Sequence, residues 1–341
     1  MAIQYLDGKR LYRVIQAGLQ RVLAREDYLN KINVFPVPDN DTGTNMAHTL
    51  TAIQDGIHEK DHPQINTMSQ EIANTALDGA RGNAGVILAQ FLVGFSEAMQ
   101  DKITITTKQF SHAVENACNY AYDALVEPQE GTILTVIREW SDYIKKHSEH
   151  LHDFQELLHN GLKRAQKSLE DTPKKLEVLR KAGVVDAGGQ GFVYLLEGIQ
   201  DFIANGKLKL YKRAEKISKQ FKPAVKTEFN QTYQFCTECT ITGTNIDKKT
   251  LQTKLKDLGD NIVLAGTAEK IKVHIHTDHP QSIFDLCSAA GIVSGEKADD
   301  MLQQQKDAHT THGEIAIVMD SACDLPNDIL EAMNIHIVPV K

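Results

Sequence analysis

The sequence predicts a multidomain protein in which an all-α domain is followed by a small α+β domain and then by the opening of an α/β domain. Three observations predict this order. Up to about residue 205, apolar residues recur at helical spacing, with almost no alternating pattern. From Gln231 the period changes to two, and a buried-type strand begins at Ile315. The length of 341 residues suits two or three domains that each bury a core.

Residues 1–205 are expected to form about eight or nine helices. Leu11, Ile15 and Leu19 recur at helical spacing, and so do the apolar residues between Ile133 and Trp140. Further amphipathic segments are expected near residues 45–57, 66–78, 84–100, 108–126, 153–169, 175–182 and 188–204. The most apolar stretch, residues 85–95, is too short to cross a bilayer, so no membrane span is expected.

Residues 206–229 form a basic, apolar-poor stretch that is interpreted as a linker. Residues 230–305 then predict a ferredoxin-like α+β domain, because strand and helix patterns alternate in the order β-α-β-β-α with a final strand. These elements are expected near residues 233–241, 248–258, 262–266, 270–277, 281–290 and 292–296. Residues 314–341 predict the first β-α-β unit of an α/β domain, with a helix starting near Pro326.

The composition excludes some classes of function. The chain has 37 Lys and Arg against 45 Asp and Glu, a formal charge of −8, so no nucleic-acid partner is expected. The first residues do not resemble a secretory signal, which predicts a cytoplasmic protein. Its 5 cysteines are then expected to be free thiols or metal ligands rather than disulfides.

The most informative segment is residues 33–46, in which one residue separates Asp39 from Asp41. Two prolines hold the approach to these acids extended. Two close carboxylates are unfavourable without a cation, and ligands that offer oxygen alone suit Mg²⁺. Residues 42–45 then open a helix, whose free N–H groups and positive dipole end favour phosphate oxygens. An ordinary N-cap turn is the alternative interpretation.

Three further loops carry glycine or acidic residues at expected helix starts: residues 79–85, 130–132 and 186–191. The first contains three glycines, which allow the backbone to approach a ligand closely, and Arg81 adds positive charge. Tight helix packing explains such a loop equally well. Together, the four loops predict a nucleotide pocket at one end of a helix barrel, although no Walker-type phosphate loop is found.

These four segments resemble the dihydroxyacetone-kinase-type (DhaL-like) nucleotide-binding domain, in the version found in FakA, the ATP-binding subunit of bacterial fatty acid kinase. The resemblance implies an eight-helix barrel that binds ATP through two Mg²⁺ ions. It implies that Asp39 and Asp41 hold Mg²⁺ for catalysis, with Asn33 at or near a third ligand position. The nucleotide-binding residues that it implies are Thr42, Gly43, Asn45, Gly82, Asn83, Ala84, Thr132, Asp186 and Gly188.

Two positions depart from the family pattern. Asn40 stands where the family has glycine between the two acids, and Ala84 replaces a serine hydroxyl. A lost neutral hydrogen bond is worth roughly 0.5–1.5 kcal/mol, so we expect ATP binding to weaken rather than vanish.

A second cluster of polar side chains is expected in residues 230–305. Alternation places His274 and His276 on one face of their strand, and Cys236 on the polar face of the preceding strand. These three side chains could converge on Zn²⁺, although strand histidines are often simply exposed. The segments resemble the FakA middle domain, which implies a zinc site at these three residues, while Cys239 is interpreted as a core thiol.

Residues 314–341 resemble the opening of a DegV domain, the fatty-acid-binding fold of FakB proteins. The resemblance implies that Asp320 and Ser321 lie near the head group of a bound acyl chain. A generic β-α-β unit is the alternative. Because the chain ends soon after this start, we expect a truncated fusion of a kinase with a DegV domain, which binds ATP but lacks its acyl pocket.

The combined hypothesis is an ATP- and Mg²⁺-dependent phosphotransferase that converts the carboxylate of a fatty acid, presented by a DegV-type domain, to an acyl phosphate. One alternative is a kinase of a small hydroxylated or keto metabolite, as in the glycerone-kinase branch. Another is a non-catalytic protein that responds to nucleotide or lipid. The family resemblance also implies a homodimer.

Overall fold

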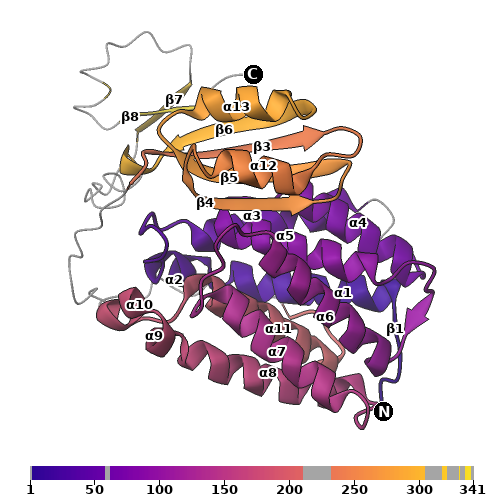
Figure 1. Ribbon diagram of the computed structural model, residues 1–341. Coiled ribbons are helices and arrows are strands. Elements are labelled where there is room, and N and C mark those ends of the chain that lie inside the picture. Colours follow the sequence, from indigo (N-terminus) through magenta and orange to yellow (C-terminus); the bar gives the residue numbers. More distant parts are fainter. Residues whose placement is uncertain are drawn as a thin grey trace. The chain divides into compact units, whose positions relative to one another are not determined.

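The computed structural model describes residues 2–57, 62–209, 232–303, 317–320, 330 and 335–338. The chain divides into two compact units, Met1–Leu302 and Gln303–Lys341, and each is described by itself. The first unit consists of a helical domain and a four-stranded sheet (Figure 1). Most of the expected basic linker lies outside the described residues.

In the part of the chain that the structure describes, eight long helices build the helical domain. They are α1 (Gly8–Leu23), α3 (Thr42–Gly56), α4 (Ile65–Asp78), α5 (Gly82–Glu97), α6 (Thr107–Asp123), α7 (Ile133–His147), α8 (Phe154–Glu170) and α11 (Ala187–Asn205). Short helices also occur: α2 (Glu26–Lys31), α9 (Thr172–Lys175) and α10 (Glu177–Ala182). The strands β1 (Leu6–Asp7) and β2 (Thr104–Ile105) pair antiparallel. The prediction of a helical first domain is confirmed.

The short helices are where the prediction was wrong. The single helix expected over residues 175–182 is interrupted at Leu176, whose backbone is extended (φ −126°, ψ 113°). Helix α2 was not expected at all. Its 6 residues make fewer than two turns, which is too short for the helical period to show in the sequence.

Helix α5 lies at the centre of the helical domain and is buried on nearly every side. Residues 84–95 are all buried, because α3, α4 and α6 pack against it and the sheet contacts it as well. A helix that is apolar all round is typical of such a central position. Among the described residues, no helix is long and apolar enough to cross a membrane.

Aromatic side chains fill the space between the helices. Trp140 of α7 contacts Phe192 of α11 edge to face, with ring centroids 5.5 Å apart, and Phe110 of α6 packs against Phe154 of α8 at 5.4 Å. Such edge-to-face pairs add to the stability that burial provides. Helices α1 and α11 cross closely, because Gly198 lies directly against the backbone of α1.

The sheet contains four antiparallel strands in the order β4-β5-β3-β6. They are β3 (Phe235–Thr242), β4 (Asp260–Gly266), β5 (Lys270–Thr277) and β6 (Ile292–Asp300), with α12 (Lys248–Leu255) and α13 (Pro280–Ser288) between them in the chain. This order and connectivity is the ferredoxin-like arrangement that the sequence predicts.

Both faces of β3, β4 and β5 are largely buried, whereas the edge strand β6 is half-buried or exposed. Apolar residues of one face, including Cys239 and Val273, pack under α12 and α13. The other face lies on the helical domain, where Val263 and Ala265 of β4 join its core. In Figure 1 the sheet lies directly over α3 and α5.

In the second unit, β7 (Ile317–Asp320) pairs in parallel with β8 (Ile335–Val338). The helix expected from Pro326 and the residue Ser321 lie outside the described residues, and the Asp320 side chain is exposed.

Candidate functional site

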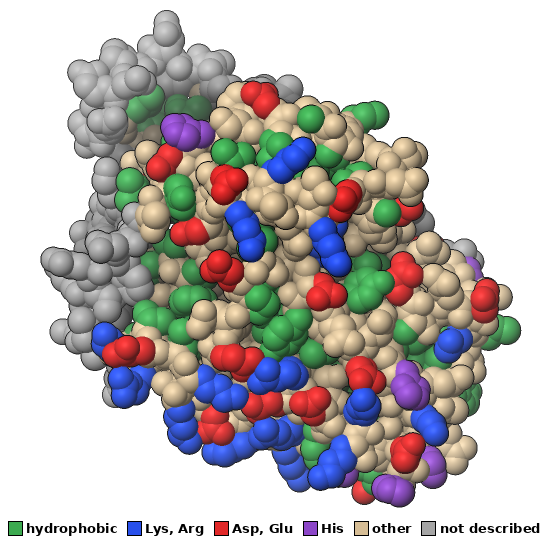
Figure 2. All heavy atoms as spheres, viewed as in Figure 1, with side chains coloured by type: hydrophobic (Ala, Val, Ile, Leu, Met, Phe, Trp, Pro, Cys, Tyr) green, Lys and Arg blue, Asp and Glu red, His purple; other side chains and the backbone are tan. Residues whose placement is uncertain are grey.

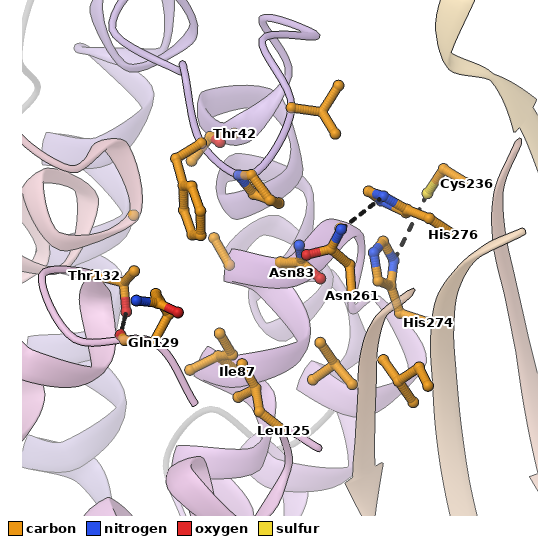
Figure 3. Close-up of a pocket in the computed structure, with 18 of the residues that line it drawn as sticks. Thr42, Asn83, Ile87, Leu125, Gln129, Thr132, Cys236, Asn261, His274 and His276 are labelled. Carbon is orange, nitrogen blue, oxygen red and sulfur yellow. Dashed lines mark hydrogen bonds between the residues drawn. The ribbon is translucent and has the colours of Figure 1, made fainter. Parts of the chain in front are cut away.

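A cavity of about 390 Å³ lies between the helical domain and the sheet. Side chains of both line it: Figure 3 shows Thr42, Asn83 and Thr132 on the helical side and Cys236, His274 and His276 on the strands. Almost all the expected site residues line this one cavity, although they come from segments far apart in the chain. They are Asn33, Asp39, Asp41, Thr42, Asn45, Gly82, Asn83, Ala84, Thr132, Asp186, Gly188, Cys236, His274 and His276.

Asp39 and Asp41 lie in the loop before α3, on either side of Asn40. Asn40 has a positive φ of 59°, a left-handed conformation that glycine and asparagine adopt more readily than other residues. The asparagine at this position therefore meets the same backbone requirement as the glycine of the family pattern.

The two carboxyl groups disfavour each other's charge. Burial raises the pKa of Asp39 well above its usual value, and the neighbouring charge of Asp41 raises it further. Burial also raises the pKa of Asp41, against the lowering effect of hydrogen bonds from Asp39 and Asn45. The charged form of each carboxyl group is therefore disfavoured, and a bound cation would offset this cost.

Asn33 completes a set of oxygen donors beside these acids. Its side chain is 2% exposed, and its amide nitrogen donates to Asp39 Oδ1 at 2.5 Å. The Asn33 Oδ1 atom is buried without a hydrogen-bond partner in the described part of the chain, and so is Asn83 Oδ1. Buried carbonyl and carboxylate oxygens with unused lone pairs fit a hard cation such as Mg²⁺.

The second loop opens helix α5 at Gly82, which has φ +58° and touches Asn45. A Cβ at this position would lie 2.3 Å from Asn45 Nδ2, so only glycine fits. Its backbone N–H donates to the Glu238 carboxylate of β3 at 2.7 Å. Gly82 lines the cavity, as expected of a nucleotide-binding residue, but its backbone N–H already has a partner in the sheet.

The third and fourth loops also line the cavity. Thr132 Oγ1 donates to the Gln129 carbonyl at 2.7 Å, just before α7. Asp186 caps α11 by accepting the N–H of Gly189 at 2.7 Å, and burial raises its pKa to about 6. Gly43, in contrast, packs against α2 and does not line the cavity: a Cβ there would lie 2.3 Å from the Glu26 carbonyl oxygen.

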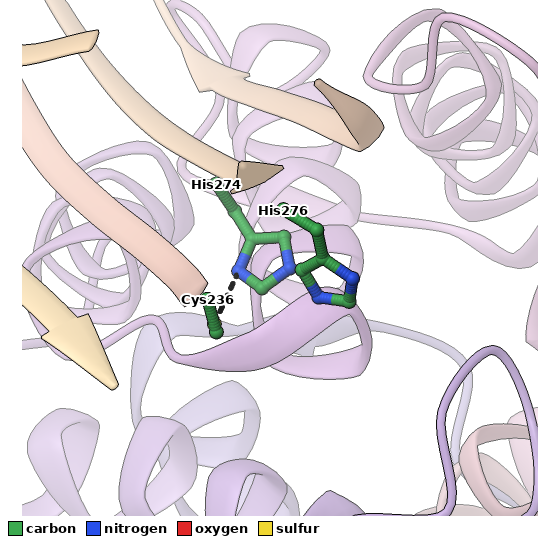
Figure 4. A group of neighbouring side chains, drawn as sticks. All are labelled: Cys236, His274 and His276. Carbon is green, nitrogen blue, oxygen red and sulfur yellow. Dashed lines mark hydrogen bonds between the residues drawn. The ribbon is translucent and has the colours of Figure 1, made fainter. Parts of the chain in front are cut away.

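Cys236, His274 and His276 meet above this cavity, as the alternation along the strands predicts (Figure 4). One ligand atom from each residue lies within 4.8 Å of the others. Pairing of β3 with β5 creates the cluster, because Cys236 is directly opposite His276. Sulfur and imidazole nitrogens at this spacing fit a Zn²⁺ ion.

The protonation of this cluster also suits a metal. Burial lowers the pKa of His276 to about 3, which keeps its ring neutral, as metal ligation requires. Burial raises the pKa of the Cys236 thiol well above its usual value, and the charges of Glu238 and Asp41 raise it further. A cation would offset these unfavourable charges.

Several polar residues in or beside the cavity were missed in the sequence. Asn261 donates to His276 Nδ1 at 3.3 Å, and Glu238 accepts from His274 at 2.9 Å. Glu238 shares the polar strand face with Cys236, so alternation could have identified it. Gln129 and Asn261 lie in segments without any periodic pattern, and no signal identifies them.

The fold and the cavity define a class of protein. In this class, the loops at the N-termini of long helices contain acidic and glycine residues and face a ferredoxin-like sheet across one cavity. Comparison with protein families matches residues 36–201 to the DAK2 domain. Residues 232–308 match the FakA-like middle domain of fatty acid kinase. Two consecutive segments of the chain are thus similar to a DAK2 domain and to a FakA-like middle domain. Neither of these two family models reaches residues 314–341.

Similar proteins occur in staphylococci. An uncharacterized protein of Staphylococcus saprophyticus is 32% identical over 317 residues, which cover 89% of this chain and 57% of that protein. An uncharacterized protein of Staphylococcus aureus strain USA300 is 30% identical over 98% of this chain and 65% of its own length. The chain therefore spans less than two thirds of these relatives.

Among solved structures, the dihydroxyacetone kinase of C. freundii in complex with AMP-PNP and Mg²⁺ matches with a TM-score of 0.43 and 14% identity. The match covers 56% of this chain and 33% of that kinase.

Proposed function

We propose that this chain is the nucleotide-binding part of a Mg²⁺-dependent kinase. One observation supports the proposal most: the half-buried pair Asp39 and Asp41 and the N-termini of α3, α5, α7 and α11 all line one cavity. Acidic ligands for a cation beside several helix N-termini suit a Mg²⁺–nucleotide complex. The two matched domain types, one of them named after fatty acid kinase, agree with this chemistry.

Each group in the cavity has a proposed task. Asp39, Asp41 and Asn33 hold Mg²⁺, whereas Thr42 and Asn45 at the start of α3 and Asn83 at the start of α5 bind phosphate oxygens. Ala84 lines the cavity without a hydroxyl, so its contact there is apolar. Thr132, Asp186 and Gly188 also line the cavity and are assigned to the nucleoside. Mg²⁺, when bound, neutralises the charge on the transferred phosphoryl group.

The proposed phosphoryl acceptor is the carboxylate of a fatty acid held by a DegV-type domain. A carboxylate is ionised at pH 7, so its oxygen can attack the γ-phosphorus without a general base. The new bond joins the carboxylate oxygen to phosphorus while the bond to the ADP oxygen breaks, which yields an acyl phosphate and ADP. The DegV-type start at residues 314–341, with Asp320 and Ser321 near the acyl head group, belongs to this proposal, as do a homodimeric assembly and a cytoplasmic location.

Cys236, His274 and His276 are proposed to hold Zn²⁺ on the sheet side of the same cavity. The ion would occupy a buried position between the sheet and the loops that bind the nucleotide. There it would compensate the negative charges of Asp41 and Glu238, both of which act on Cys236. A zinc content of one equivalent that falls in His274→Ala would support this assignment.

The test is phosphoryl transfer by the chain, supplied with Mg²⁺, ATP, a fatty acid and a DegV-type acyl-binding protein. Trapping with hydroxylamine converts an acyl phosphate to a hydroxamate, which is then quantified. Asp39→Asn is expected to abolish product, whereas Asp55→Asn, an exposed acid on α3, is expected to leave it unchanged. Hydroxamate that forms equally well in Asp39→Asn would contradict the proposal. Transfer to dihydroxyacetone instead of the fatty acid would favour the small-metabolite kinase.

A further inference from the structure

Glu238 joins the two halves of the cavity through hydrogen bonds. It lies in β3 with 2% of its side chain exposed, opposite His274 in the strand pairing. Its Oε1 atom accepts the backbone N–H of Gly82, the first residue of α5, at 2.7 Å. The same oxygen is 2.9 Å from His274 Nδ1, and Lys272 Nζ lies 3.5 Å from Oε2.

The chemistry of this carboxylate determines which nitrogen of His274 carries the proton. The Glu238 Oε1 atom accepts the Gly82 N–H, and at 2.9 Å it is placed to accept a second hydrogen bond from His274 Nδ1–H. This geometry places the proton of a neutral His274 ring on Nδ1. The Nε2 atom then carries a lone pair. It is buried and has no hydrogen-bond partner in the described part of the chain, and the His274 side chain lines the cavity.

We propose that Glu238 is a positioning residue that sets the ring of His274 and the first turn of α5 at the same time. Two donors from different domains share one of its oxygen atoms, so neither can move without loss of a charge-assisted hydrogen bond. The carboxylate also meets the positive end of the α5 dipole, where a negative charge is favoured. That this pair of elements holds a metal and a nucleotide rests on the proposed function; the positioning itself does not.

The arrangement has a consequence for the cavity. Because Glu238 already occupies the Gly82 N–H, the phosphate contacts on this loop fall to the residues that follow, of which Asn83 has a buried unpartnered Oδ1 and lines the cavity. His274 presents Nε2, rather than Nδ1, to anything that binds beside it. A carboxylate on the second nitrogen is the usual partner of a histidine that ligates a metal.

The test compares three variants without nucleotide or added metal. Glu238→Met keeps the length of the side chain but has no acceptor, Glu238→Gln keeps one acceptor oxygen without charge, and Thr237→Val is the control on the same strand. Nitrogen-15 spectra of labelled histidine, assigned with His274→Gln, report the tautomer of His274. Hydrogen exchange reports the protection of the Gly82 amide.

We expect wild type and Thr237→Val to show the proton on Nδ1 and a protected Gly82 amide. In Glu238→Met, the proton should move to Nε2 and the Gly82 amide should exchange about tenfold faster or more. Glu238→Gln should largely restore both signals. The proposal is wrong if Glu238→Met shows the same His274 tautomer and the same Gly82 amide protection as Thr237→Val. It is also wrong if wild type carries the His274 proton on Nε2.

Glu238→Met leaves Lys272 buried without its partner and could fail to fold. The double variant Glu238→Met/Lys272→Met removes that charge and should show the same two changes. Neither readout requires phosphoryl transfer, so a chain with no kinase activity but the expected tautomer would contradict only the proposed function.

Discussion

Asp39 and Asp41 offer carboxylate oxygens that suit a cation. Without a cation, two neighbouring carboxylates are expected to lower the stability of the folded chain. Burial and mutual repulsion raise the pKa of Asp39 well above its usual value. A site that is preorganised for a ligand commonly lowers stability in this way. The cost should therefore be measurable as a change in thermal stability.

Asp39→Asn is expected to unfold at a higher temperature than wild type in the presence of a chelator, because it removes one of two competing buried charges. The Asn33 amide can still donate to the new carboxamide oxygen. Each 1 kcal/mol gained corresponds to about 2–4 °C in a domain of this size. Mg²⁺ should raise the melting temperature of wild type more than that of the variant. A variant less stable than wild type in chelator, with Asp55→Asn unchanged, would show that the acids do not repel each other.

Because the pKa of Asp186 is raised, we expect the free energy of unfolding of the chain to depend on pH. Its pKa is about 6 in the folded chain, above the ordinary value of 3.8, so the folded state holds the proton more tightly. The resulting stabilisation is present below about pH 4 and is lost as the pH rises through about 6, a change of about 3 kcal/mol at most.

Asp186→Asn should lack this component, since asparagine cannot ionise and is an equally good N-cap. The measurement is the free energy of unfolding from chemical denaturation between about pH 4 and pH 7.5. The difference between wild type and variant should shrink or reverse as the pH rises. Parallel curves would mean that Asp186 titrates normally.

At the scale of elements, the crossing of α1 and α11 depends on the absence of a side chain. A Cβ on Gly198 would lie 2.4 Å from the Ala17 carbonyl oxygen and 2.8 Å from Gly18 Cα, so the helices would have to separate. These contacts are with backbone, which cannot rotate away.

Gly198→Ala is therefore expected to destabilise the chain by about 1–3 kcal/mol. Helix propensity alone predicts the opposite sign, a gain of up to about 1 kcal/mol. Denaturant unfolding distinguishes the two, with Lys163→Ala on the exposed surface of α8 as a control expected within about 0.5 kcal/mol of wild type. A stabilised Gly198→Ala would show that the two helices are not in close contact.

A helix or strand could be predicted where its own apolar residues recur with the helical or strand period. The long helices and the strands of the sheet are at the expected places because their apolar residues recur over many turns or pairs. Helix α2 was not predicted, because its 6 residues are too few to show a helical period. The break at Leu176 was not predicted either, because no local pattern marks it. Asn40 was interpreted as a departure because the sequence does not show the positive φ that it adopts.

For the whole of the first unit, the contact between the helical domain and the sheet is what creates the cavity. Alternation along two strands predicted that Cys236, His274 and His276 share a face. It could not predict that this face is buried against the helical domain, because that depends on contacts between residues more than 150 positions apart, such as Gly82 with Glu238. One further contact of this kind is polar and fully buried: Gln90 Oε1 accepts the N–H of Gly266 at 2.5 Å.

Gln90→Leu should destabilise both domains together by about 1–3 kcal/mol, because it leaves the buried Gly266 N–H without an acceptor. Fluorescence of Trp140, the single tryptophan, reports the helical domain, and hydrogen exchange of β5 amides reports the sheet. Both should shift by the same free energy, while Gln70→Leu on the exposed side of α4 shifts neither. A change confined to one domain would show that the two unfold independently.

The central claim is that Asp39 and Asp41 bind a Mg²⁺–nucleotide complex in the cavity between the helical domain and the sheet. Calorimetric titration with a non-hydrolysable ATP analogue tests it directly. The account predicts binding that requires Mg²⁺, that weakens by about tenfold or more in Asp41→Asn, and that is unchanged in Asp55→Asn. Equal affinity in the presence of chelator, or equal affinity of Asp41→Asn and wild type, would contradict it.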